Sequence, residues 1–122
     1  MTIHYVQIEV ADLSRSSDFY EAVLSPLGWR SQQESAGSVS WGLIKPALYL
    51  TQSSNGAPLG SATISLPGKS IPAVRAAYEA ALEKGAIPES ELGVDPLMGR
   101  GNYAVRLRDP DGNLIEICVA HD

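Results

Sequence analysis

The sequence predicts an α+β protein in which two βαβββ modules form a cup-shaped mixed sheet. Two observations lead to this prediction: the same order of elements occurs twice along the chain, and each copy has one helix for several strands. A sheet covered by a single helix leaves its other face open, so two copies facing each other would enclose a cleft. We expect a single domain over residues 1–122, with module one at about 1–58 and module two at about 59–122.

The first module begins with a strand and continues with an amphipathic helix. Residues 3–10 alternate between apolar and polar side chains, which is the period of a strand with one apolar face. Asp12 is the expected N-cap of a helix that Pro26 and Gly28 end. Three β-rich segments complete the module, at 29–33, 38–44 and 47–52. The small and polar residues of 53–60 predict a linker.

The second module repeats this order. Residues 61–66 are predicted to form a strand, Ser70 to cap a helix, and Gly85 to end it. Three further β-rich segments follow, at 86–89, 102–108 and 113–120. Residues 92–100 contain a proline, a methionine and two glycines, so we expect a loop there that is able to form a lid.

Composition and charge exclude several classes of protein. The net charge of −5 without a Lys/Arg cluster argues against a nucleic-acid or anionic-membrane partner. No apolar run approaches the roughly 18 residues that a membrane-spanning helix needs. Cys118 is the single cysteine, which excludes an internal disulfide and a cysteine-based zinc site. Met1 leads directly into a strand-like segment without the features of a secretory signal, so we expect a soluble cytoplasmic protein.

The most informative residue is Glu116, a carboxylate within an apolar strand. The segment 109–112, Asp-Pro-Asp-Gly, predicts a tight turn between two strands. Glu116 lies in the second of these strands, where a lone carboxylate is costly unless it is paired, hydrogen-bonded or bound to a metal. A two-for-two register around the turn places Arg106 opposite Glu116, and such an arginine can pair with the carboxylate.

Two interpretations of this pair remain open. In the first, Arg106 and Glu116 form a structural ion pair that holds the cup closed. In the second, Arg106 anchors an anionic or carbonyl ligand, and Glu116 is the candidate catalytic residue, acting as an orienting partner or as a general base. An apolar cup suits a carboxylate that accepts a proton, whereas a facing arginine opposes that role.

Motifs near both ends of the chain carry a family resemblance. HYVQIEVADL at 4–13 is followed by Phe-Tyr at 19–20 and by Leu-Gly-Trp at 27–29, and DPDGNLIE occupies 109–116. Together these motifs resemble the vicinal oxygen chelate superfamily, which includes glyoxalase I, bleomycin-resistance proteins, fosfomycin-resistance transferases and extradiol dioxygenases. The resemblance covers almost the whole chain and implies the glyoxalase/bleomycin resistance fold of two βαβββ modules. It does not determine function, because the superfamily includes lyases, transferases, dioxygenases and binding proteins.

The resemblance also implies where a metal would be bound. Metal-using members hold the ion with a His on the first strand, a His or Glu on the strand that opens the second module, and a Glu on the last strand. Glu116 matches the last ligand, but Tyr5 and Ser61 stand at the other two positions, and Tyr49 stands where some members add a Glu. Because neutral hydroxyls are poor ligands for divalent metals, we expect no metal cofactor. The alternative is Zn, Ni, Mn or Fe held by Glu116 with His4, if a bulge turns His4 into the cup.

Strand parity and the resemblance indicate which side chains line the cup. We predict these as ligand-binding residues, with Glu9 also facing the cup: Tyr5, Gln7, Tyr49, Ser61 and Arg106. Trp41 is predicted to add an aromatic wall to the pocket, with core packing as the alternative. Cys118 shares the strand face of Glu116, and we expect it to be a small buried apolar side chain.

We therefore predict a cytoplasmic, glyoxalase-like homodimer that binds a small organic molecule in its cup without the usual catalytic metal. The functional analogy is with bleomycin-resistance-type proteins, and the dimer is implied by the resemblance. The alternative is an enzyme, either a metal-dependent or a Glu-based lyase, isomerase or dioxygenase of the glyoxalase/dioxygenase type. A structural or regulatory partner domain is a third class, for which the sequence offers no positive signal.

Overall fold

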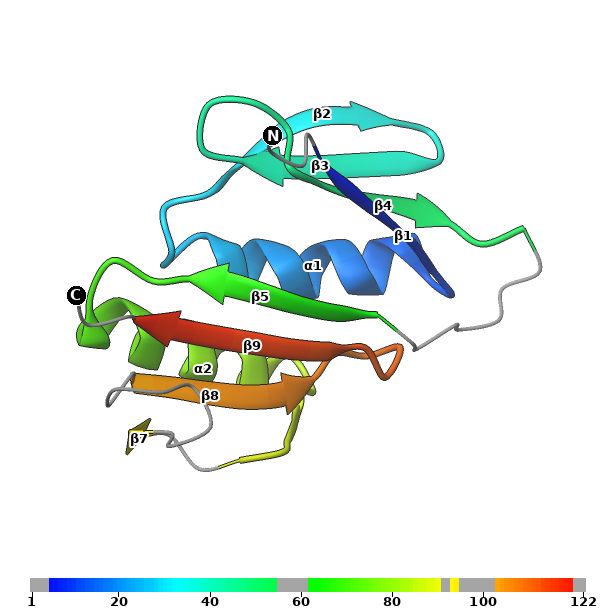
Figure 1. Ribbon diagram of the computed structural model, residues 1–122. Helices are drawn as coiled ribbons and strands as arrows, with labels where there is room; N and C mark the ends of the chain where they lie inside the picture. The colour runs from blue at the N-terminus through cyan, green and yellow to red at the C-terminus, as the bar shows by residue number, and fades with distance from the viewer. Residues whose placement is uncertain (1–4, 55–61, 91–92, 95–102, 120–122) are drawn as a thin grey trace.

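A computed structural model describes residues 5–54, 62–90, 93–94 and 103–119 of the chain (Figure 1). Within these residues two sheets and two helices form an α+β structure, and each module contributes one sheet and one helix, which confirms the predicted fold class. Neither helix among the described residues is long and apolar enough to cross a membrane.

Module one forms a four-stranded mixed sheet, here called sheet A. Its elements are β1 (Val6–Val10), α1 (Leu13–Leu24), β2 (Arg30–Ser35), β3 (Ser38–Gly42) and β4 (Leu48–Gln52). The strand order is β1-β4-β3-β2, with β1 parallel to β4 and the other pairs antiparallel. Asp12 caps α1 as predicted, because its side chain accepts the backbone N–H of Arg15. Gly28 follows the helix with a φ of +90°, a conformation that favours glycine.

Module two forms the second mixed sheet, here called sheet B. Its elements are β5 (Thr63–Pro67), α2 (Ile71–Glu83), β6 (Ile87–Pro88), β7 (Gly93–Val94), β8 (Tyr103–Arg108) and β9 (Leu114–Val119). The order is β5-β9-β8-β6, with β5 parallel to β9 and β7 also paired with β8. Ser70 caps α2 as predicted, since its hydroxyl accepts the backbone N–H of Ala73. The strand β7 lies inside the segment predicted as a loop, whose residues 92 and 95–100 lie outside the described residues.

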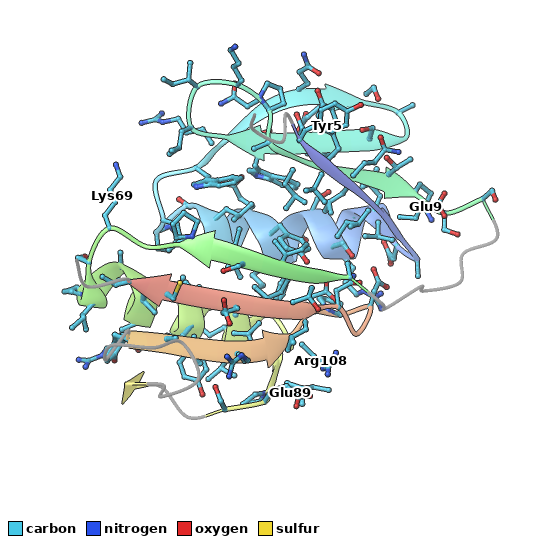
Figure 2. The ribbon with its side chains drawn as sticks, in the orientation of Figure 1. Tyr5, Glu9, Lys69, Glu89 and Arg108 are labelled. Carbon is cyan, nitrogen blue, oxygen red and sulfur yellow. The ribbon has the colours of Figure 1, made fainter. Side chains whose placement is uncertain are left out.

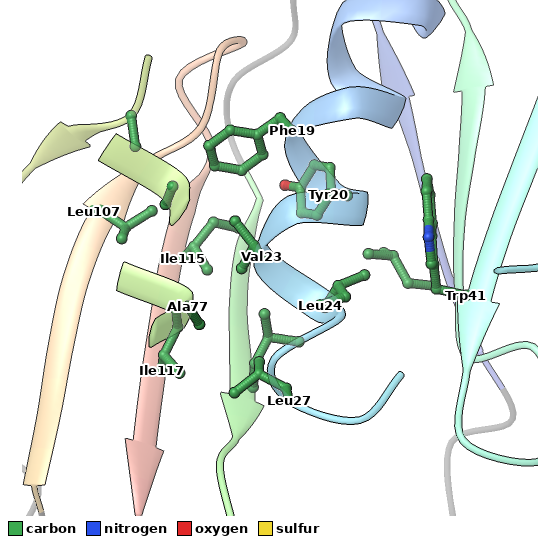
Figure 3. Packing of buried hydrophobic residues seen from close by; sticks show 14 of the residues in the cluster. Phe19, Tyr20, Val23, Leu24, Leu27, Trp41, Ala77, Leu107, Ile115 and Ile117 are labelled. Atoms are coloured by element: carbon green, nitrogen blue, oxygen red, sulfur yellow. The ribbon is translucent and has the colours of Figure 1, made fainter. Parts of the chain in front are cut away.

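Both helices lie on the same side of the two sheets and contact each other (Figure 1). One hydrophobic core fills the space between the helices and the sheets, and it contains side chains from both modules. Figure 3 shows side chains of α1 between β9 on one side and Trp41 on the other, among them Phe19, Tyr20, Val23 and Leu24. The opposite faces of both sheets carry no helix in the part of the chain described, and we call them the open faces.

The β8–β9 turn is tied to α1 by buried hydrogen bonds. Asp109, 3% exposed, accepts the backbone N–H groups of Asp111 (2.9 Å) and Asn113 (2.8 Å) through Oδ1. Its Oδ2 accepts a hydrogen bond from the side-chain amide N–H of Asn113 (3.0 Å) and another from the phenol O–H of Tyr20 (2.5 Å). Burial, followed by the charge of Asp109, raises the pKa of Tyr20 well above its usual value, so this phenol stays a donor at neutral pH.

A second carboxylate of the turn extends the link to the first turns of α1. Asp111 Oδ1 accepts a hydrogen bond from Arg15 Nη2 (2.9 Å), and Asp111 Oδ2 accepts one from the hydroxyl of Ser16 (3.3 Å). Gly112 has a φ of +90°, the conformation that the predicted turn requires. Through these bonds the hairpin that carries Arg106 and Glu116 is held against module one.

Candidate functional site

Glu116 lies on the open face of sheet B within a small polar cluster. The β8–β9 register pairs it with Arg106, as predicted, and the β5–β9 register pairs it with Ser65. Arg106 Nε donates to Glu116 Oε2 at 3.2 Å, and Ser65 Oγ donates to Glu116 Oε1 at 2.8 Å. The side chains of Arg106 and Glu116 are 22% and 16% exposed, so the ion pair is mostly shielded from water.

These contacts explain how the carboxylate of Glu116 is accommodated in an otherwise apolar strand. Each carboxylate oxygen accepts one hydrogen bond, and the guanidinium supplies a compensating charge, so the cost of burying the carboxylate is offset. Ser65 is the member that sequence reasoning missed. Its role depends on the pairing of β5 with β9, whose partners Ser65 and Glu116 lie 51 residues apart.

The open face of sheet A carries three of the predicted ligand-binding residues. Gln7 and Tyr49 are paired across β1 and β4, and the ring of Tyr5 lies 5.0 Å from the ring of Tyr49 at an interplanar angle of 62°. Tyr49 donates its phenol O–H to Gln33 Oε1 at 3.2 Å. Tyr5 is 52% exposed, and Figure 2 shows Tyr5 and Glu9 toward the two ends of β1. Gln33 was not predicted, because only the β2–β3 register brings it beside Tyr49.

Trp41 does not lie on the open face, and its interpretation as a wall of the cup is corrected. It is 1% exposed and packs in the core, 6.3 Å from the ring of Tyr20, while its Nε1 donates to Glu21 Oε1 of α1 at 2.9 Å. The physical reason is strand parity: Trp41 pairs with Leu48, which faces the helix, whereas its neighbour Ser40 pairs with Tyr49. Core packing, the alternative stated above, is what the structure shows.

Two predicted residues, His4 and Ser61, lie outside the described residues. Among the residues that are described, no group of three or more His, Cys, Asp or Glu side chains is placed to hold a metal ion. Cys118 is partly rather than fully buried. Burial and then the charge of Glu116 raise the pKa of its thiol, with Ser65 opposing, so the thiol stays protonated at neutral pH.

Hollows lie beside these residues. A pocket of about 230 Å³ lies where β1 and β5 approach each other, and it is lined by Tyr5, Val6, Trp29, Ala47, Leu48, Ile64, Ser65 and Leu66. A more polar hollow of about 340 Å³ is lined by Gln33, Glu34, Ser35, Ser38 and Tyr49. A third, of about 490 Å³, lies at the end of α1 and is lined by Glu21, Ser25, Gly28, Trp29, Arg30 and Ser31.

Comparison with solved structures shows the same fold over nearly the whole chain. A glyoxalase/bleomycin resistance protein from Albidiferax ferrireducens is 25% identical, with a TM-score of 0.85 and coverage of 97% of this chain and 98% of that one. A putative glyoxalase from Bacillus halodurans is 23% identical, with a TM-score of 0.74 and coverage of 98% and 96%. A glyoxalase/bleomycin resistance protein/dioxygenase family enzyme from Burkholderia phytofirmans is 17% identical, with a TM-score of 0.72 and coverage of 97% and 98%.

The sequence itself matches one family model over most of its length. No curated protein matches the chain. The family model is that of the Glyoxalase/Bleomycin resistance protein/Dioxygenase superfamily, and it matches residues 2–117. The chain therefore belongs to the glyoxalase/bleomycin resistance protein/dioxygenase superfamily.

Proposed function

We propose that this protein binds a small organic molecule on the open faces of its sheets, and that the Arg106–Glu116 pair stands in place of the catalytic metal. The proposal rests on the hydrogen bonds that the carboxylate of Glu116 accepts. Both of its carboxylate oxygens already accept hydrogen bonds, one from Arg106 and one from Ser65. A carboxylate held in this way has a protein partner for its charge, so it does not need a metal ion to be stable in its strand.

The charge of Arg106 also opposes a metal at this position. A divalent cation about 5 Å from a guanidinium is repelled by several kcal/mol at an effective dielectric constant of about 20. The residues at two other family ligand positions, Tyr5 and Tyr49, contact each other through their rings instead. Their phenols are neutral oxygens, which bind transition metals more weakly than imidazole or carboxylate.

The open faces combine two neighbouring tyrosine rings with several polar groups, which can orient a small molecule. Tyr5, Gln7 and Tyr49 lie on sheet A, and the Arg106–Glu116–Ser65 cluster lies on sheet B. We further propose a cytoplasmic homodimer, on the ground that single-domain members of this superfamily commonly pair two chains.

Metal analysis tests the proposal. Wild type, Glu116→Gln and the control Glu83→Gln are purified without chelator, and their metal content is measured. Glu83 lies in the last turn of α2 and is exposed, so the control makes the same chemical change away from the site. We expect less than stoichiometric Zn, Ni, Mn and Fe in all three proteins, and thermal stabilisation of the wild type by members of a metabolite and drug panel.

One result would favour the enzyme alternative. Stoichiometric metal in wild type and in Glu83→Gln, but not in Glu116→Gln, would show that Glu116 is a metal ligand. The protein would then be treated as a metal-dependent lyase, isomerase or dioxygenase, and the metal-free proposal would be abandoned.

A further inference from the structure

The hairpin of β2 and β3 forms one edge of sheet A, and its residues line the hollow of about 340 Å³ (Figure 1). We call it the hairpin hollow. Four side chains of its lining share the open face by strand register. Gln33 and Tyr49 both pair with Ser40. Ser35 pairs with Ser38, which lies two residues before Ser40 and so on the same face of β3. The volume falls in the range of small-molecule pockets, about 300 to 1,000 Å³.

The aromatic part of the hairpin hollow is held in place from two sides. The ring of Tyr49 lies 5.0 Å from the ring of Tyr5, and its phenol O–H donates to Gln33 Oε1 at 3.2 Å. Ser40, which is fully buried, accepts a hydrogen bond from the backbone N–H of Gln33 at 3.1 Å, beside the irregular register of β2. A ring and an amide that are already held lose little freedom when a ligand binds.

The polar groups of the hairpin hollow are neutral and still have capacity for hydrogen bonds. The hydroxyls of Ser35 and Ser38 and the amide nitrogen of Gln33 make no hydrogen bond with any described residue. A serine hydroxyl both donates and accepts hydrogen bonds, and an amide nitrogen donates two. A ligand hydroxyl also donates and accepts, so it complements each of these groups.

The nearest charged side chains of sheet A lie away from the centre of the hairpin hollow. Glu34 borders it, but Glu34 pairs with Val39, which packs against the core, so strand alternation turns its carboxylate from the open face. Glu9 lies two strands from Ser38, about 10 Å at ordinary strand spacing. Arg30, at the start of β2, lines the hollow at the end of α1 instead. A charged group in the hairpin hollow would lose water without gaining an opposite charge, which favours a neutral ligand.

We propose that the hairpin hollow binds one ring of a neutral sugar or a similar polyol. The apolar face of the ring lies against Tyr49, and its hydroxyls bond to the amide and the serine hydroxyls of β2 and β3. A sugar ring has an apolar C–H face and a rim of hydroxyls, which an aromatic ring and neutral polar groups complement. This inference rests on the proposed function and names the class of molecule that sheet A binds.

Four probes with a six-membered ring test the proposal: methyl glucoside, which is neutral, glucosamine, which is cationic, glucuronate, which is anionic, and cyclohexanol, which has a single hydroxyl. Each is titrated into the isotope-labelled protein, and the amide chemical shifts are followed by NMR. With methyl glucoside we expect saturable shifts at residues of the lining, namely Gln33, Ser35, Ser38 and Tyr49. We expect no tighter binding of either charged sugar, and at least tenfold weaker binding of cyclohexanol.

Three results with the probes would overturn the proposal. Tighter binding of glucosamine or glucuronate than of methyl glucoside would show that the hollow recognises a charge. If Glu34→Gln abolished such a preference for glucosamine, that charge would be the Glu34 carboxylate. Equal binding of cyclohexanol would show that the sugar hydroxyls are not recognised. Absence of saturable shifts with methyl glucoside at tens of millimolar would show that no sugar binds.

Variants test the polar contacts. Gln33→Leu removes the amide and Ser35→Ala removes one hydroxyl, both at exposed positions of the edge strand β2. The loss of one hydrogen bond corresponds to about fivefold weaker binding, which we expect of methyl glucoside with each variant. Ser14→Ala is the matched control, because Ser14 is exposed on α1, on the other side of the sheet. The same spectra check the fold, and unchanged binding in both β2 variants would overturn the proposal.

The outcomes separate this inference from the proposed function. Absence of methyl glucoside binding, together with a panel ligand whose binding resists Gln33→Leu and Ser35→Ala, would overturn the hairpin hollow and leave binding on the open faces standing. Metal that depends on Glu116 would overturn the proposed function on its own measurement.

Discussion

Removing the phenol O–H of Tyr20 should destabilise the protein by about 2 kcal/mol. Tyr20 is fully buried in α1, and its O–H donates to Asp109 Oδ2 at 2.5 Å. Tyr20→Phe keeps the ring and its packing while deleting this hydrogen bond to a carboxylate. Hydrogen bonds to charged groups contribute about 1.5 to 3 kcal/mol. Asn113 still donates to the same oxygen at 3.0 Å, so the carboxylate keeps one partner, and we take the middle of this range.

Urea unfolding of wild type and variant measures the loss. The midpoint should fall while the slope of the transition stays unchanged, because the surface exposed on unfolding is the same. For a chain of 122 residues, 2 kcal/mol corresponds to a decrease in Tm of about 8 °C.

The control is Tyr78→Phe, which deletes the same group from α2, where Tyr78 is only partly buried. It should change the free energy of unfolding by less than about 0.5 kcal/mol. Equal effects of the two substitutions would refute the reasoning that the Tyr20–Asp109 bond holds the β8–β9 turn against module one.

Three further changes have expected outcomes. Arg106→Met leaves Glu116 partly buried without its cation and should lower the free energy of unfolding, measured by urea titration, by about 1 to 2 kcal/mol. The double variant Arg106→Met/Glu116→Gln should recover much of this loss. A double variant no more stable than the single one would contradict the pairing. Gly112→Ala places a side chain at a φ of +90° and should cost about 1 kcal/mol by the same assay, and an unchanged midpoint would argue against the turn conformation. Burial raises the pKa of Tyr20 above 10.0, so its contribution is complete below pH 10 and is lost as the pH rises above 10, where only the unfolded chain ionises this group. Stability measured from pH 8 to 11 should therefore decline less in Tyr20→Phe than in wild type, and parallel declines would contradict this.

The part of the site that the sequence predicted correctly is the part set by local chemistry. The turn at 109–112 has the residues that its conformation requires, and a tight turn determines the register of the strands on either side. Arg106 therefore faces Glu116 as expected. The caps Asp12 and Ser70 were predictable for the same reason, because each accepts an N–H three residues away.

The parts that were missed depend on long-range pairing. The turn residue Asp109 looks like a local turn former in sequence, but its hydroxyl donor Tyr20 lies 89 residues away. Ser65 reaches Glu116 only because β5 is parallel to β9. For Trp41, a strand that is apolar at one position and polar at the next has two possible orientations, and the β3–β4 register selects the one in which tryptophan faces the helix.

Metal-dependent stability tests most directly whether Arg106 and Ser65, rather than an ion, satisfy Glu116. Chelator-treated wild type, Glu116→Gln and Glu83→Gln are unfolded by heat with and without added Zn²⁺, Ni²⁺, Mn²⁺ or Fe²⁺. An ion bound only by the folded protein raises Tm with its concentration. We expect no increase in Tm that depends on Glu116. An increase at micromolar metal in wild type and Glu83→Gln, absent from Glu116→Gln, would contradict the account.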